Sequence, residues 1–129
     1  MESHIREIVI NEDPGLLISE AKILAEHIHG KGEATKTQLR RLFSSLKNID
    51  FSWPRRLDAP NAQSALDDAY HKLLLLSPRM AYTSARHEPL KGLCMEIQKG
   101  ISYVDKNDRK TFERLVEFFE AVLGYYIGH

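Results

Sequence analysis

The sequence predicts an all-α fold, a single-domain bundle of five to six helices, and three observations support this prediction. Apolar residues recur every three or four positions along most of the chain, as on the buried face of an amphipathic helix. Residue types that begin and end helices separate these stretches, and no alternating run of convincing length predicts a strand. Residues 4–10 are expected to be extended or disordered, within a flexible segment at residues 1–12.

The first half of the chain carries two predicted helices. Asp13 and Pro14 form an N-cap followed by proline at the first helical position, and Gly30 ends the helix. Thr35 and Gln38 match the T-x-x-Q capping box that would open the second helix. The two apolar stripes are Leu17, Ala21, Leu24 and Ile28, and then Leu39, Leu42, Phe43, Leu46 and Ile49.

Three or four further helices follow a proline-bearing loop at residues 51–60. One begins near Ala62, and Ser77–Pro78 repeats the cap-plus-proline pattern and predicts the start of another. Pro89 either kinks that helix or begins a new one. Asp108 caps the last helix, which has the most regular apolar stripe: Phe112, Leu115, Val116, Phe119, Val122, Leu123 and Tyr126.

Composition is that of an ordinary globular protein, with 129 residues, 43% of them hydrophobic and 28% charged. Cys94 is the only cysteine and cannot form an internal disulfide, which favours a reducing, cytoplasmic location. The first ten residues lack the apolar core of a signal peptide. The apolar run Leu73–Leu76 is too short to cross a bilayer, so no membrane association is expected.

Charge is distributed unevenly along a chain whose formal net charge is zero. Residues 1–34 contain seven acids and three bases, whereas residues 36–56 contain six bases and a single acid, Asp50. A local excess of cations usually meets a polyanion, and nucleic acid is the commonest one.

Three of these cations share one side of the second predicted helix. On a helical wheel with Leu39 at zero, Lys36, Arg40 and Lys47 lie between about 60° and 100°, next to the apolar stripe. Like charges at this spacing slightly destabilise an isolated helix, and an anionic ligand would remove that cost. The strip is therefore predicted to bind phosphate. The alternative is a solvated basic face, or cations paired with acids of the N-terminal helix.

The loop after this helix extends the positive charge through Arg55 and Arg56. Pro54 stiffens the loop, and Phe51 and Trp53 place aromatic rings beside the guanidinium groups. This combination suits RNA, because arginine matches phosphate and rings can stack on bases. A lone tryptophan followed by proline more often covers the core of a small bundle, so Trp53 is predicted to be buried.

Patterns that suggest enzyme chemistry fail on geometry, so no catalytic residue, metal or cofactor is predicted. Glu26-x-x-His29 and Asp68-x-x-His71 have the spacing of carboxylate and histidine ligands in metal-binding bundles. Both pairs lie away from the apolar stripes, whereas such a metal site must lie inside the bundle. The chain also has no glycine-rich phosphate loop and no serine or cysteine nucleophile motif.

The run Leu73–Leu76 is apolar around most of its helix, because Leu74 and Leu75 point away from the stripe through Ala69 and Leu73. Two interpretations remain open. The leucines are buried within the bundle, or they contact another subunit, which includes a second copy of the isolated chain in a homodimer.

Three short motifs occur in order within residues 15–127. They are Thr35-x-Thr37-Gln38-Leu39-Arg40, Pro78-Arg79-Met80-Ala81-Tyr82 followed by Arg86, and Phe118-Phe119-Glu120-Ala121-Val122-x-x-Tyr125. Together, in an all-α chain of this size, they resemble the small subunit of type III-A CRISPR–Cas effector complexes, the Csm family.

This resemblance implies a non-catalytic subunit of an antiviral ribonucleoprotein. Copies of such a subunit would stack beside the subunits that hold the guide RNA, and would line the channel in which single-stranded target RNA pairs with the guide. The resemblance implies RNA contacts at four positions, Lys36, Arg40, Arg79 and Arg86. Charge alone adds three further predicted RNA-binding residues, Lys47, Arg55 and Arg56.

Two other functions remain open. A helix-turn-helix DNA-binding protein would use the second helix to enter the major groove, after the turn that contains Gly30 and Gly32. A helical adaptor would bind only protein, through Leu74 and Leu75. Salt-sensitive RNA binding would distinguish the RNA-binding subunit from the adaptor. The side chains offered to DNA would be Thr35, Lys36, Thr37, Gln38 and Arg40.

Overall fold

The computed structural model describes residues 4–28 and 30–127. This part of the chain contains six α-helices and no β-strand, which confirms the predicted all-α bundle. A short 3₁₀ helix, η1, occupies Glu88–Leu90, so Pro89 begins a new element rather than kinking the previous one. The α-helices are α1 (Ile5–Val9), α2 (Pro14–Ile28), α3 (Glu33–Ser52), α4 (Ala62–Arg86), α5 (Lys91–Ser102) and α6 (Arg109–Ile127).

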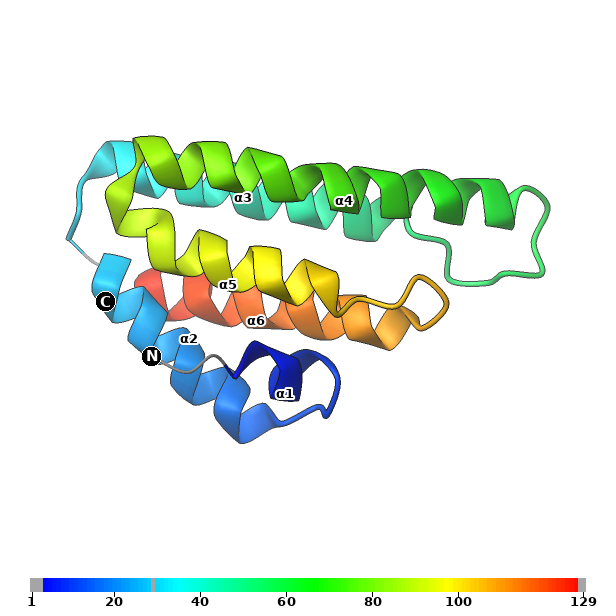
Figure 1. Ribbon diagram of the computed structural model, residues 1–129, viewed down its shortest axis with the longest axis horizontal. Helices are drawn as coiled ribbons and strands as arrows, with labels where there is room; N and C mark the ends of the chain where they lie inside the picture. Colours follow the sequence, from blue (N-terminus) through cyan, green and yellow to red (C-terminus); the bar gives the residue numbers. More distant parts are fainter. Residues whose placement is uncertain (1–3, 29, 128–129) are drawn as a thin grey trace.

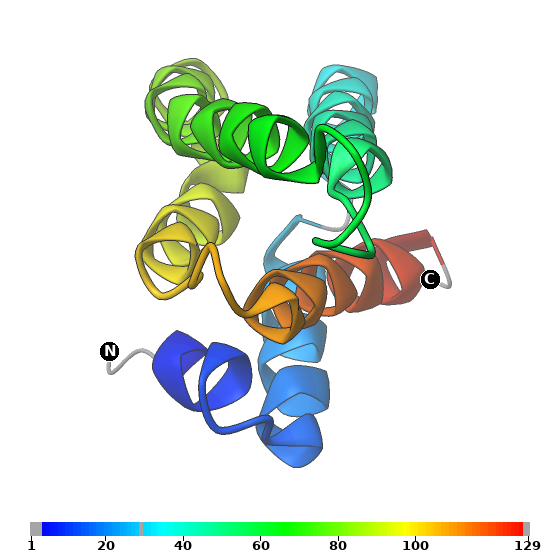
Figure 2. The ribbon, with the colours of Figure 1, turned by 90° about the vertical axis from the view of Figure 1, so that its right-hand side faces the viewer.

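The helices are arranged in three layers (Figures 1 and 2). Helices α3 and α4 lie side by side along the long axis and form one outer layer, α5 and α6 form the middle layer, and α1 and α2 cover the other face. Helix α6 is central because it packs against α1, α2, α3 and α5. Its rings fill the core, since Phe112, Phe118 and Phe119 are all fully buried. None of the described helices is long and apolar enough to span a bilayer.

Residues 5–9 form a helix, whereas the sequence predicted an extended or flexible segment. Ile5, Ile8 and Val9 are buried against α6, α2 and α5. Arg114 of α6 also donates from Nη1 to the carbonyl oxygens of Val9 (2.9 Å) and Ile10 (3.2 Å), at the C-terminal end of α1. The packing and this cap stabilise a helix that is too short to show a periodic sequence pattern.

Helix α4 continues through Pro78, so the helix start predicted at Ser77–Pro78 is wrong. Proline removes one backbone hydrogen bond in a helix interior and is normally unfavourable there. Here α4 packs against both α3 and α5, and tertiary packing overrides that local preference. The buried stripe passes across the proline without a break: Leu66, Ala69, Leu73, Leu76, Met80 and Thr83.

Two of the four predicted N-caps, at Asp13 and Asp108, occur as expected. Asp13 Oδ1 accepts from the N–H of Leu16 (3.1 Å), and Asp108 Oδ1 accepts from the N–H of Lys110 (3.2 Å). The capping box at Thr35 is wrong, because α3 begins earlier, at Glu33. Thr35 Oγ1 instead donates to the carbonyl oxygen of Lys31 at 3.4 Å. Gly32 precedes the helix with φ of 102°, a left-handed conformation that favours glycine.

Candidate nucleic-acid interface

All seven predicted RNA-binding residues lie in one layer of the fold, formed by α3, the loop at residues 53–61 and α4. Residues 33–86 contain nine bases and five acids, whereas residues 4–28, in the layer on the other side of the molecule, contain two bases and five acids. The fold therefore converts an uneven charge distribution along the sequence into a separation of charge between two faces.

Lys36, Arg40 and Lys47 lie along α3 beside its buried stripe, and we call these three residues the α3 strip. Lys36 is half-buried, and the other two are exposed. Neither Lys36 nor Arg40 forms an ion pair with any residue in the ranges 4–28 and 30–127. Pairing of these two cations with acids of the N-terminal helix, the alternative interpretation, is therefore absent from the described structure.

Lys47, at the other end of the strip, has acidic neighbours. Its Nζ lies 3.7 Å from Asp50 Oδ2, with 47% of the lysine side chain exposed. A groove of about 300 Å³ between α3 and α6 contains Lys47 together with Glu113, Glu117 and Glu120 of α6. The field that Lys47 presents to an anion is therefore weaker than at the start of α3.

Asp50 joins α3 to α6 and to the loop that follows α3. It accepts from Arg109 Nη2 at 2.6 Å, and Arg55 Nη2 lies 4.0 Å away. Arg109 also pairs with Glu113, while its Nη1 is buried and has no hydrogen-bond partner among the described residues. The only acid of the basic stretch thus serves as a structural anchor, with 16% of its side chain exposed.

Arg55 and Arg56 are less available than their sequence suggests. Arg55 Nη1 donates to the carbonyl oxygens of Asp50 (3.1 Å) and Trp53 (2.9 Å), and so caps the C-terminal end of α3. Arg56 forms a bidentate pair with Asp58 (3.2 and 3.0 Å), in which both side chains are more than two-thirds exposed. Such an exposed pair contributes little to stability, and Arg56 can leave Asp58 to bind another anion.

Trp53 is a core residue, as predicted, with 2% of its surface exposed. Its ring stacks on Phe112 of α6, with 4.6 Å between centroids and 14° between planes, and meets the edge of Tyr70 at 6.4 Å. The tryptophan therefore fixes the loop to the middle layer and is not available to stack on a base.

Arg79 connects the two helices of the outer layer, because its Nη1 donates to Ser45 Oγ at 2.7 Å. Arg79 lines a groove of about 350 Å³ between α3 and α4, together with polar side chains of α3 and with Lys72. Lys72 pairs with Asp68 at 3.1 Å. Farther along α4, Arg86 donates to the Tyr82 hydroxyl at 3.0 Å and lies over its ring at 5.5 Å.

Arg41 is a further exposed cation of α3 that was not predicted from the sequence as an RNA-binding residue. Arg41 is exposed, has no ion pair in the described part of the chain, and lies one turn before Ser45, which Arg79 contacts. The wheel that identified the α3 strip places Arg41 near 200°, on the opposite flank. Only the position of α4 shows that this flank also borders a basic groove.

The leucine run of α4 is buried on one side only. Leu73 and Leu76 belong to the core, whereas 44% of Leu74 and 56% of Leu75 are exposed. The interpretation that the whole run is buried within the bundle is wrong, and a contact with another subunit remains a prediction.

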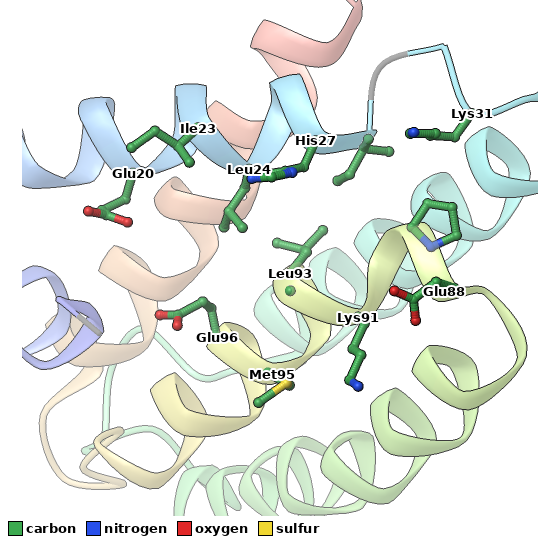
Figure 3. Close-up of a pocket in the computed structure, with 13 residues that line it drawn as sticks. Glu20, Ile23, Leu24, His27, Lys31, Glu88, Lys91, Leu93, Met95 and Glu96 are labelled. Atoms are coloured by element: carbon green, nitrogen blue, oxygen red, sulfur yellow. The ribbon is translucent and has the colours of Figure 1, made fainter. Parts of the chain in front are cut away.

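A third groove, which was not predicted from the sequence, lies between α2 and the segment η1–α5, with a volume of about 460 Å³. Figure 3 shows Leu24 of α2 pointing toward Leu93 of α5 across it, with Glu20 and Glu96 toward one end. Ile23 and Met95 at its rim are 42% and 56% exposed. Three glutamates and two lysines line this groove, so it does not resemble a phosphate site.

The proposed metal-ligand patterns do not converge in the structure. Asp68 and His71 are exposed, as the helical wheel predicted, and His29 lies outside the described residues. Among the described residues, no group of three or more His, Cys, Asp and Glu side chains could hold a metal ion. Cys94 is buried, and burial raises the pKa of its thiol to about 11, which disfavours the nucleophilic thiolate.

A family model described as Csm2 Type III-A matches residues 11–127, a range that includes α2 to α6 and therefore the whole basic layer. No curated protein and no solved structure shows a significant match to the chain.

Proposed function

Because the chain belongs to the Csm2 family of type III-A CRISPR effector complex small subunits, we propose that it binds the phosphate backbone of RNA within that complex. The proposed ligands are the guide RNA and the single-stranded target RNA, and the proposed surface is the α3–α4 layer. The protein would hold RNA in place without catalysing a reaction, in the cytoplasm and in antiviral defence.

The observation that carries this proposal is the pair of cations at the start of α3. Lys36 and Arg40 have no acidic partner in the described structure, and they lie on a rigid helix rather than in a loop. Arg41 and Arg79 add unpaired positive charge on the other flank of α3. A helical row of unpaired cations matches a chain of phosphates, and attraction of this kind is independent of sequence.

The test is the salt dependence of binding of unstructured RNA to the full-length protein. If about four phosphates are contacted, the logarithm of the association constant should fall with log salt at a slope near −3, from roughly −0.7 per contact on single strands. A flat salt dependence would contradict the proposal. So would a clear preference for one duplex DNA sequence over single-stranded RNA.

The helix-turn-helix alternative is weakened by the burial of side chains in the first turn of α3, the helix that would have to read DNA. Thr35, one of the residues expected to face the major groove, is only 4% exposed, and Gln38 is half-buried. A recognition helix needs these first-turn side chains free to reach base edges.

A role without catalysis has its own test. Metal analysis of the purified protein and a nuclease assay across common divalent ions should both be negative. Stoichiometric bound zinc or iron, or a cleavage activity that is lost in Glu26→Gln or His71→Ala, would contradict this part of the proposal.

Leu74 and Leu75 are proposed as a contact with another subunit of the complex, or with a second copy of the isolated chain. They are neighbouring leucines exposed on the outer helix α4, and a hydrophobic pair of this kind is a common interface feature. Sedimentation of the isolated protein should show less self-association for Leu75→Asp than for the natural chain. Unchanged sedimentation together with unchanged assembly of the effector complex would exclude this contact.

A further inference from the structure

Phe51, the penultimate residue of α3, has the most exposed large hydrophobic side chain in residues 4–28 and 30–127, with 89% of its surface accessible. Phenylalanine is usually among the more buried residue types. The other four phenylalanines of the chain are buried or half-buried. The exposed ring of Phe51 therefore needs an explanation beyond folding.

The ring lies at the end of the α3 strip. Phe51 is four residues after Lys47, and on the same helical wheel it lies near 120°, beside the angles of the three cations. Lys36, Arg40, Lys47 and Phe51 thus follow one side of α3 from its first turn to its last. A chain of phosphates that follows the cations would bring a nucleotide to the ring.

The backbone around Phe51 is anchored on both sides. Asp50 bonds to Arg109 of α6 at 2.6 Å, and Trp53 stacks on Phe112 of α6. Arg55 Nη1 connects the carbonyl oxygens of Asp50 and Trp53, which stiffens the end of the helix. The ring is therefore displayed from a fixed position, and binding would cost little ordering of the backbone.

We propose that Phe51 stacks on a nucleobase of the single-stranded RNA whose phosphates lie along the α3 strip. This inference rests on the proposed function. It means that the protein contacts a nucleobase of the RNA as well as its phosphate groups. Every base has a π-face, so such stacking strengthens binding without selecting a sequence. Positively charged side chains that track a backbone next to an aromatic platform are a general arrangement for single-stranded nucleic acids.

The test compares two ligands with the same number of phosphates, a single-stranded RNA oligomer and an abasic oligomer of equal length. The full-length protein should bind the oligomer with bases more tightly. Phe51→Ala should lower the affinity for that oligomer by about five- to 140-fold, the range that stacking of one base supplies, and should leave the abasic oligomer unaffected. Phe51→Leu, which keeps apolar volume but lacks an aromatic face, should behave like Phe51→Ala, and Phe51→Trp should retain tight binding.

Phe51→Trp also provides a direct readout. The only natural tryptophan, Trp53, is 2% exposed and stacked on Phe112, so its fluorescence should change little when RNA is added. Tryptophan at position 51 should be quenched by the RNA oligomer and not by the abasic one. Because Phe51 is exposed, all three variants should keep the thermal midpoint of the natural protein.

The outcomes separate this inference from the proposed function. If Lys36→Ala and Arg40→Ala lower the affinity for both oligomers while Phe51→Ala lowers the affinity for neither, the phosphate-binding surface is supported and the stacking of Phe51 is wrong. If Phe51→Ala instead prevents entry into the reconstituted complex without changing RNA affinity, the ring is a protein contact and stacking is equally wrong. If neither oligomer binds to the chain, alone or in the complex, the proposed function fails and this inference fails with it.

Discussion

Arg109 of α6 donates from Nη2 to Oδ1 of Asp50 in α3 over 2.6 Å, although the two residues are 59 positions apart in the chain. Both side chains are more than four-fifths buried, so the bond is shielded from solvent. It holds the end of α3 against α6, and it occupies the only acid in the basic stretch. This contact therefore fixes the position of the candidate interface, and it leaves Lys36, Arg40 and Arg41 without an acidic partner from the basic stretch.

We expect Asp50→Asn to destabilise the fold, because Arg109 would keep only Glu113 of its two charged partners, while its Nη1 is already without a hydrogen-bond partner in the described structure. Loss of a hydrogen bond to a charged group should lower the free energy of unfolding by about 1.5–3 kcal/mol. Urea denaturation measures this change. Asp58→Asn is the matched control, since its pair with Arg56 is exposed and should contribute less than about 1 kcal/mol. Equal effects of the two substitutions would contradict the anchoring role of Asp50.

Helical periodicity predicted the core of the long helices well, and it failed where tertiary packing overrides local pattern. Leu39, Leu42 and Leu46 are buried in α3 as the wheel indicated. The short helix α1 was not predicted, because five residues cannot show a period and its stability comes from contacts with α6. The sequence predicts a helix start at Ser77–Pro78, because it does not reveal the packing of α4 on both sides.

The candidate site could be predicted only in part, for a similar reason. Lys36 and Arg40 were selected by their angle on one helix, which the sequence specifies. The backbone bonds of Arg55 depend on how the loop after α3 turns, and the contact between Arg79 and Ser45 depends on how α3 and α4 align. No spacing rule encodes the path of the loop or the alignment of the two helices.

Two glycines in helices should respond in opposite directions to alanine. A Cβ at Gly100 of α5 would lie 2.5 Å from Leu115 Cδ1 and 3.1 Å from Ile5 Cγ1, and both neighbours are buried and cannot move freely. Overpacking of this kind should lower the free energy of unfolding by about 1–3 kcal/mol. Gly124 of α6 has nothing within 4 Å of its Cβ position, so Gly124→Ala should raise stability by up to about 1 kcal/mol. Thermal melts of the two variants provide the measurement, and a stabilised Gly100→Ala would contradict the close packing of α5 against Leu115 of α6 and Ile5 of α1.

Alkaline pH should destabilise the protein in part through Cys94. Burial raises the pKa of its thiol from 9.0 to about 11, so between these values the unfolded chain releases a proton that the folded protein keeps. The contribution of the Cys94 thiol to the free energy of unfolding is fully present below pH 9. It is lost as the pH rises toward 11, by as much as about 2 kcal/mol. Cys94→Ala should lack this component, although its cavity costs stability at every pH. Urea denaturation at pH 8 and pH 10.5 gives the comparison, and an equal loss in both proteins would contradict the prediction.

The last prediction separates RNA binding from folding. Lys36→Ala and Arg40→Ala remove cations that have no partner in the described structure, so each should change the free energy of unfolding by no more than about 0.5 kcal/mol. Leu42→Ala removes a side chain that is 1% exposed and should cost on the order of 2–5 kcal/mol. In the reconstituted effector complex, the two charge substitutions should lower the affinity for target RNA while the thermal midpoint of the isolated protein barely moves. Arg40→Glu should lower the affinity for target RNA more than Arg40→Ala does, because repulsion from phosphate adds to the loss of the contact. If Arg40→Ala unfolds the protein, the arginine is a structural partner, and if Arg40→Glu leaves RNA capture unchanged, the RNA follows a different surface.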